Sequence, residues 1–195
     1  MLSADIRDLL EAVRDDAADW CEGRSPWLRA ALFFYLAYAG IRHLLDPFWV
    51  SWFSALTLGF HELGHLVALP FGMTVHLLGG SVAQVLVPLA AAIYLAVRQR
   101  DYFGFAVCIA WMAFAEYEMA TYMADASRER LPMVGFTQHP IHDWSALFTQ
   151  WHVLNYCDEI ATGVRVVAFA TWAAAMAWGG WLLWQMAWPW RARRE

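Results

Sequence analysis

Residues 57–69 read Thr-Leu-Gly-Phe-His-Glu-Leu-Gly-His-Leu-Val-Ala-Leu, and the rest of the chain is interpreted outward from them. His61 and His65 are four positions apart, so on a helix they stand on one face, one turn from each other. Two imidazoles placed in this way can take two corners of a tetrahedral metal site. Glu62 cannot easily reach the same ion, but it can accept a proton from metal-bound water. The pattern therefore predicts a zinc site on a helix, with Glu62 as the general base.

The surroundings of this pattern are strongly apolar. Of the 195 residues, 61% are hydrophobic and 16% are charged, and the mean hydropathy is +0.38. Such a composition is too apolar for a soluble domain. Ionisable groups are costly in hydrocarbon unless they pair with each other or with an ion. The alternative is a pair of buried histidines bonded to backbone carbonyls, which would leave Glu62 without a role.

Five stretches are long enough to cross about 30 Å of hydrocarbon as helices of roughly 20 residues. They lie near 27–45, 48–71, 79–98, 102–124 and 163–188. The connections between the first four are short, so neighbouring spans are expected to pack antiparallel. The sequence therefore predicts an all-α fold, a polytopic membrane helix bundle with about five transmembrane helices.

Two further helices are expected outside the spans. The segment 1–25 has apolar residues at helical spacing after Ser3, which suits an N-cap, and its polar face is acidic. An acidic face argues against binding to anionic lipid. In the long connection 125–162, apolar residues at helical spacing follow Asp143, so we expect an interfacial helix with Asp143 as its N-cap.

The predicted organisation is one membrane domain with short flanking segments. We divide the chain into an amphipathic N-terminal helix (1–25), a transmembrane domain carrying the metal site (26–190) and a basic tail (191–195). The net charge of −5 gives no indication of nucleic-acid binding. Cys21, Cys108 and Cys157 are scattered, which excludes a thiolate metal site and a disulfide framework. No signal peptide is predicted. We expect an integral, multi-pass protein of the bacterial inner membrane.

The third metal ligand is predicted from depth in the membrane. If the spans 48–71 and 102–124 run in the same direction, Glu118 lies at the depth of the two histidines and is the leading candidate. The next connection leaves from the same end, so His139 or His142 could fold back over the ion, and His142 is the competing ligand. Asp125 and Asp143 stay open as alternatives. Asp125 is expected nearer the surface, and Asp143 could orient an imidazole instead of binding.

The segment Phe60-His-Glu-Leu-Gly-His-Leu66, on a predicted membrane helix, resembles the site-2 protease family of intramembrane zinc metalloproteases. The later Gly79-Gly80 and Val87-Pro88-Leu89 are similar to that family's glycine-rich stretch and its small-residue-plus-proline element. The resemblance covers about a third of the chain. That family usually takes its third ligand from an aspartate in an Asn-Pro or Leu-Asp-Gly context, and no such string occurs here.

The resemblance implies a helix bundle around Zn2+, with His61 and His65 as ligands and Glu62 as the base. The expected function is hydrolysis of peptide bonds in membrane-embedded substrates, with the lipid bilayer and membrane-protein substrates or partner subunits as partners. The alternative is a non-catalytic zinc-binding accessory or assembly subunit of a larger membrane protein complex. A di-iron membrane oxidase using the HELGH and HPIHD strings is a third interpretation, but seven histidines are few for two irons.

Overall fold

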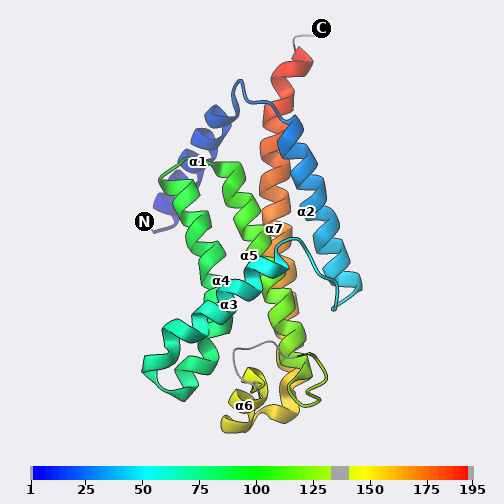
Figure 1. Ribbon diagram of the computed structural model, residues 1–195. Coiled ribbons are helices and arrows are strands. Elements are labelled where there is room, and N and C mark those ends of the chain that lie inside the picture. Colours follow the sequence, from blue (N-terminus) through cyan, green and yellow to red (C-terminus); the bar gives the residue numbers. More distant parts are fainter. Residues whose placement is uncertain (1, 133–140, 193–195) are drawn as a thin grey trace.

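The computed structural model describes residues 2–132 and 141–192, and over these residues the regular structure is entirely helical. Figure 1 shows an elongated bundle in which α7 is the longest element. The helices are α1 (Leu2–Cys21), α2 (Trp27–Leu45), α3 (Ser54–Ala68), α4 (Met73–Val97), α5 (Tyr102–Asp125), α6 (Asp143–Gln150) and α7 (Cys157–Ala192), with 3₁₀ turns at Leu69–Phe71 and Leu154–Tyr156. The predicted all-α class is confirmed.

Three helical segments are long and apolar enough to cross a membrane, namely Met73–Val97, Tyr102–Asp125 and Leu154–Ala187. At 1.5 Å per residue, the 25 residues of α4 extend about 37 Å, which exceeds the hydrocarbon thickness of about 30 Å. Large apolar side chains such as Leu86 and Ile93 point outward from α4. These features indicate a membrane protein.

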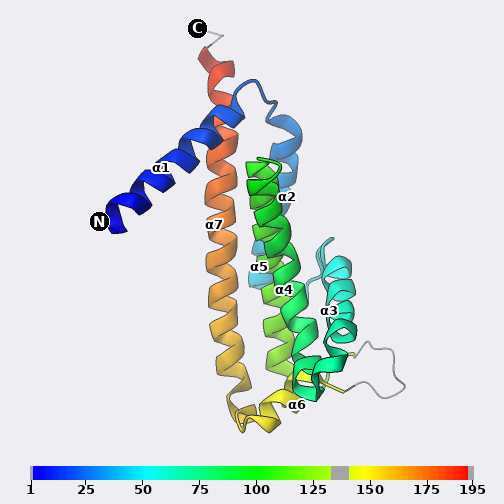
Figure 2. The same ribbon diagram turned by 90° about the vertical axis from the view of Figure 1, so that its left-hand side faces the viewer.

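The five predicted crossings are not reproduced. α3 has 15 residues and is about 22 Å long, too short to span the hydrocarbon by itself. Figures 1 and 2 show that α2 and α3 both run downward in these views, with α3 steeply inclined to α2 in Figure 1 and ending below it. The expected antiparallel arrangement is therefore wrong for this pair. The connection turns locally without reversing the chain: Asp46 accepts the Phe48 N–H, and the Trp52 N–H donates to the Tyr35 hydroxyl.

The hairpin formed by α3 and α4 is packed backbone against backbone. Gly72, at φ +93°, turns the chain after the 3₁₀ segment, a conformation that favours glycine. A Cβ on Gly64 would collide with the carbonyl oxygen of Gly79. A Cβ on Gly79 would in turn lie 2.5 Å from the carbonyl oxygen of Gly64. Small residues thus allow the two helices to approach closely, as in other membrane bundles.

The remaining elements pack around α5. This helix lies between α4 and α7, and its side chain Phe114 is fully buried. The predicted N-terminal helix is present as α1, which docks on α7 through Ala17 and Cys21. The predicted interfacial helix is present as α6, but its N-cap is His142, whose Nδ1 accepts the Ser145 N–H. The end of the predicted basic tail, 193–195, lies outside the described residues.

Candidate metal centre

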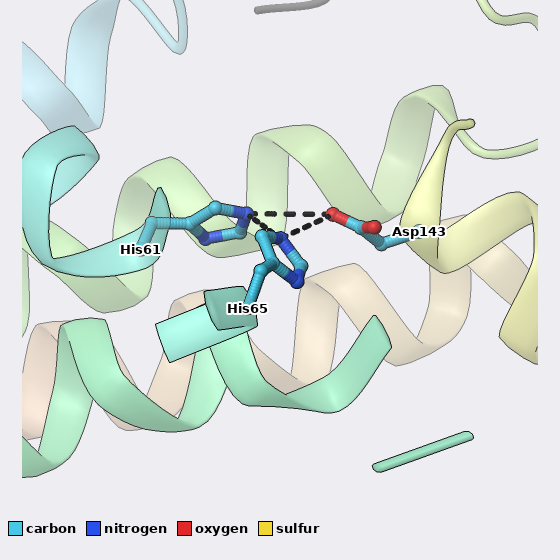
Figure 3. Close-up of side chains that lie close together, drawn as sticks. All are labelled: His61, His65 and Asp143. Carbon is cyan, nitrogen blue, oxygen red and sulfur yellow. Dashed lines mark hydrogen bonds and ion pairs between the residues drawn. The ribbon is translucent and has the colours of Figure 1, made fainter. Parts of the chain in front are cut away.

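Two helices bring three metal-binding side chains together (Figure 3). The rings of His61 and His65 project from α3 toward the carboxylate of Asp143, the first residue of α6. The Nε2 atoms of His61 and His65 lie 3.4 Å and 3.3 Å from Asp143 Oδ2, and 3.0 Å from each other. His61 and Asp143 are buried and His65 is half-buried. Among the described residues, these three form the group that could hold a metal ion.

Hydrogen bonds on the far side of each ring decide which nitrogen faces the centre of the group. The carbonyl oxygen of His76 can only accept, so the Nδ1–H of His65 donates to it at 2.7 Å. The Nε2 of Gln84 donates to the Ala115 carbonyl, so its Oε1 accepts the Nδ1–H of His61 at 2.7 Å. In the neutral imidazoles both Nε2 atoms then carry lone pairs. Such outer hydrogen bonds orient histidine ligands in metal sites.

The resulting group is three electron-pair donors facing one another. Burial by itself raises the pKa of the Asp143 carboxyl, but when His61 and His65 carry a hydrogen on Nε2 they donate to Asp143 Oδ2, which outweighs burial and lowers the pKa to about 2. A metal ion would take the place of those hydrogens between the three atoms. Ligands about 2.05 Å from a tetrahedral ion are about 3.3 Å apart. The three observed separations, 3.0, 3.3 and 3.4 Å, match one face of that tetrahedron.

A glycine on the neighbouring helix α4 leaves space for the imidazole rings of His61 and His65. A Cβ on Gly80 of α4 would lie 2.5 Å from Nε2 of His65 and 2.6 Å from Nε2 of His61. Real Cβ atoms do not approach other atoms so closely. The absence of a side chain at Gly80 is therefore required by the two imidazoles.

Tyr122 of α5 holds the start of α6 against the group. Its hydroxyl accepts the backbone N–H of Asp143 at 3.1 Å and lies 3.4 Å from Asp143 Oδ2. Its ring also packs on His142, with centroids 4.1 Å apart. These contacts hold Asp143 against α5, and the Tyr122 ring also contacts the ring of His61 on α3.

Glu62 lies beside the group on α3. Its side chain is half-buried, and within the described part of the chain no hydrogen bond or ion pair holds its carboxylate. A carboxylate in this position is available for proton transfer, the role predicted from the sequence.

The candidate third ligands lie at different distances from the two imidazoles. Glu118 accepts a hydrogen bond from the Ser54 hydroxyl at the start of α3 and does not join the group. The Nδ1 of His142 caps α6, and its Nε2 lies 3.7 Å from Asp125 Oδ2. Asp143, which was expected to orient or to bind, is the carboxylate that lies within 3.4 Å of both imidazoles. Asp125 accepts two backbone N–H groups of the following loop, and His139 lies outside the described residues.

Sequence reasoning missed two residues that orient the histidines, Gln84 and His76. Gln84 is a carboxamide within an otherwise apolar span, which is itself a signal because polar groups in hydrocarbon need a partner. The Nδ1–H of His76 donates to the His65 carbonyl at 2.9 Å while the His76 carbonyl accepts from His65. This reciprocal pair crosses the turn between α3 and α4 and has no signature in sequence spacing.

The chain matches no protein-family model, and no curated protein and no solved structure matches it. The function is therefore inferred from the geometry of the metal centre and its membrane setting.

Proposed function

We propose that this protein is an integral membrane zinc metalloprotease of the site-2 protease type, in which His61, His65 and Asp143 hold Zn2+ and Glu62 is the general base. One observation carries the proposal: the two Nε2 atoms and Asp143 Oδ2 converge with tetrahedral spacing while the Nδ1 atoms are held from behind. Two histidines and one carboxylate are an established ligand set for hydrolytic zinc.

In the proposed hydrolysis, zinc would activate a water molecule and Glu62 would transfer its proton. Zinc, when bound, would polarise a water molecule and bring its pKa toward neutrality. Glu62 accepts the proton as the water attacks a peptide carbonyl, and then returns it to the leaving amine. Tyr122, whose hydroxyl adjoins Asp143, is placed to donate a hydrogen bond to the developing oxyanion.

The proposed substrate is a helix of a membrane protein that has unwound locally, because an intact helix keeps its carbonyls hydrogen-bonded. The side chains of Phe34 and Leu45 on α2 and of Leu66 and Val67 on α3 are exposed and apolar, which favours contact with lipid. α2 and α3 would then share one broken crossing, beside the crossings of α4, α5 and α7. This arrangement gives a multi-pass protein, which we propose for the bacterial inner membrane.

Element analysis combined with one conservative variant tests the proposal. The purified chain is expected to contain about one zinc, and Glu62→Gln is expected to keep it, because Glu62 is not a ligand. Cleavage of a panel of single-span membrane peptides, read by mass spectrometry, should fall by about 10²-fold or more in Glu62→Gln. Glu159→Gln, an exposed position at the start of α7, is the matched control and should retain activity.

Each other outcome has a defined meaning. Zinc without cleavage by the wild-type chain would favour the non-catalytic accessory or assembly subunit. Iron in place of zinc would overturn the hydrolase, since two histidines and one carboxylate also hold iron(II) in oxygenases. Cleavage that is unchanged in Glu62→Gln would remove the general base from the mechanism.

A further inference from the structure

A second region with unusual polar groups lies between α2, α5 and α7. These helices line an open cavity of about 410 Å³, a volume typical of small-ligand sites. None of the residues that line this cavity belongs to the group formed by His61, His65 and Asp143, called the metal group below. The lining residues that matter here are His43, Leu44, Tyr117, Arg165, Val166 and Phe169.

Two buried polar atoms at this cavity have no hydrogen-bond partner in the described part of the chain. His43 and Tyr117 are each 4% exposed, and neither His43 Nε2 nor the Tyr117 hydroxyl is bonded. Their rings stack with centroids 5.6 Å apart and planes 5° apart, so both side chains are held in place. A buried polar group without a partner costs about 1–3 kcal/mol. The pair is therefore a pre-formed hydrogen-bonding set that a ligand could engage.

Arg165 adds a positive charge to the same wall. It lies within Leu154–Ala187, a segment apolar enough to cross a membrane, where a charge normally has a counter-ion. Among the described residues, no hydrogen bond or ion pair engages its guanidinium. Asp158, two turns earlier on α7, instead pairs with Arg128, with N–O distances of 3.1 and 2.7 Å. Asp158 also acts on Arg165 through space, but it is hydrogen-bonded to Arg128, so the Arg165 guanidinium stays available to an anionic ligand.

The other side chains that line the cavity are apolar, and the cavity is open on the side where they lie. Leu44, Val166 and Phe169 are 46%, 64% and 47% exposed, respectively. In a membrane, this open side would face the acyl chains of the bilayer. A ligand that fits must therefore combine an anionic, hydrogen-bonding head with a hydrocarbon tail.

We propose that the cavity binds an anionic phospholipid. Its phosphate would pair with Arg165 and hydrogen-bond to His43 and Tyr117, while one acyl chain would lie against Leu44, Val166 and Phe169. The proposal does not depend on the proposed protease activity, because the two sites share no residue.

Lipid retention by the full chain in a neutral detergent tests this proposal. Phosphatidylglycerol, phosphatidylcholine and inorganic phosphate are added separately, and binding is followed by native mass spectrometry and by the midpoint of thermal unfolding. Phosphatidylglycerol should bind and raise the midpoint, phosphatidylcholine should bind more weakly, and inorganic phosphate should have no effect. Arg165→Gln should weaken phosphatidylglycerol binding by about tenfold or more. Arg98→Gln, which removes an exposed charge at the end of α4, is the control and should bind normally.

Three outcomes would overturn the proposal. The first is equal retention of phosphatidylglycerol by the wild type and Arg165→Gln, and the second is equal binding of the two lipids. The third is an equal shift with inorganic phosphate, which would indicate a site for the free anion. If Arg165→Gln does not fold, Tyr117→Phe replaces it, because the variant keeps the stacked ring and removes the hydroxyl. Its phosphatidylglycerol affinity should fall several-fold, and an unchanged affinity would contradict the proposal.

Discussion

The metal group and the α2/α5/α7 cavity contain similar residue types but differ in how their polar atoms are satisfied. At the metal group, the Nδ1 atoms of His61 and His65 are hydrogen-bonded and their Nε2 atoms converge on Asp143. At the cavity wall, His43 Nε2 and the Tyr117 hydroxyl are buried and have no hydrogen-bond partner in the described part of the chain. The difference is the basis of the two proposals, a small cation at the first site and a larger, anionic ligand at the second.

The largest expected effect is loss of the metal. His61→Ala removes one of three ligands, so zinc should fall from about one per chain to nearly none by element analysis. His152→Asn is the matched control, because His152 is exposed and has a positive φ that asparagine tolerates. Full zinc content in His61→Ala would show that the group is not a metal site.

The second test fills the space beside the two imidazoles. Gly80→Ala places a methyl group about where both Nε2 atoms lie, so we expect weaker zinc binding and a loss of about 1–3 kcal/mol in the free energy of unfolding. Gly59→Ala on α3 is the control, since a Cβ there meets no atom within 4 Å. Helix propensity should make the control neutral or slightly stabilising. Equal behaviour of the two variants, in zinc titration and thermal unfolding, would exclude the close approach of α4.

The third test removes the hydrogen bond between Gln84 and His61 and leaves the three proposed ligands unchanged. Gln84→Leu leaves the Nδ1–H of His61 without an acceptor, so the ring loses its fixed orientation, and zinc affinity should fall about 10- to 100-fold. A competition titration with a zinc chelator measures this change. Gln99→Leu, at an exposed position just beyond α4, should bind zinc like the wild type. An unchanged affinity in Gln84→Leu would mean that other contacts orient His61.

The smallest effects are expected from two tyrosines on the same helix, and they separate the two regions directly. Tyr122→Phe loses the acceptor for the Asp143 N–H, so zinc affinity should fall about tenfold. Tyr117→Phe removes a hydroxyl that has no partner among the described residues, so zinc affinity should not change and stability should stay within about 1 kcal/mol. Zinc titration and thermal unfolding of both variants provide the measurement. A loss of zinc affinity in Tyr117→Phe would contradict the independence of the two sites.

The local pattern around His61 and His65 was sufficient to predict the helix and the paired imidazoles, because the spacing of side chains on a helix is fixed by geometry. The helices near 27–45 and 102–124 and the helix beginning at Asp143 were also found, since their apolar periodicity and length are properties of short segments. The five predicted crossings are not confirmed, since three helical segments are long and apolar enough to cross a membrane. Hydropathy alone does not show that the chain turns at 46–53 and that α3 begins only at Ser54.

The third ligand could not be fixed from the sequence for the same reason. Depth was estimated from a span assumed to begin at residue 48, which placed Glu118 beside His61. In the structure, Glu118 lies at the level of Ser54, and Tyr122, one turn later, lies at the level of the metal group. Asp143 reaches the group only because α6 folds back, and that long-range contact has no periodic signature. Gln84 and His76 depend equally on the close packing of α3 and α4.

His61 and Asp143 are 82 positions apart in the chain. An ion bound to both would be a reversible cross-link. It would close a loop of the chain that includes α4, α5 and the segment leading to α6. By analogy with a covalent cross-link, such closure removes disorder from the unfolded chain and contributes about 4 kcal/mol to stability. Treatment with a strong chelator should therefore lower the unfolding temperature and expose α6 to proteolysis before the helical hairpin of α3 and α4 is attacked.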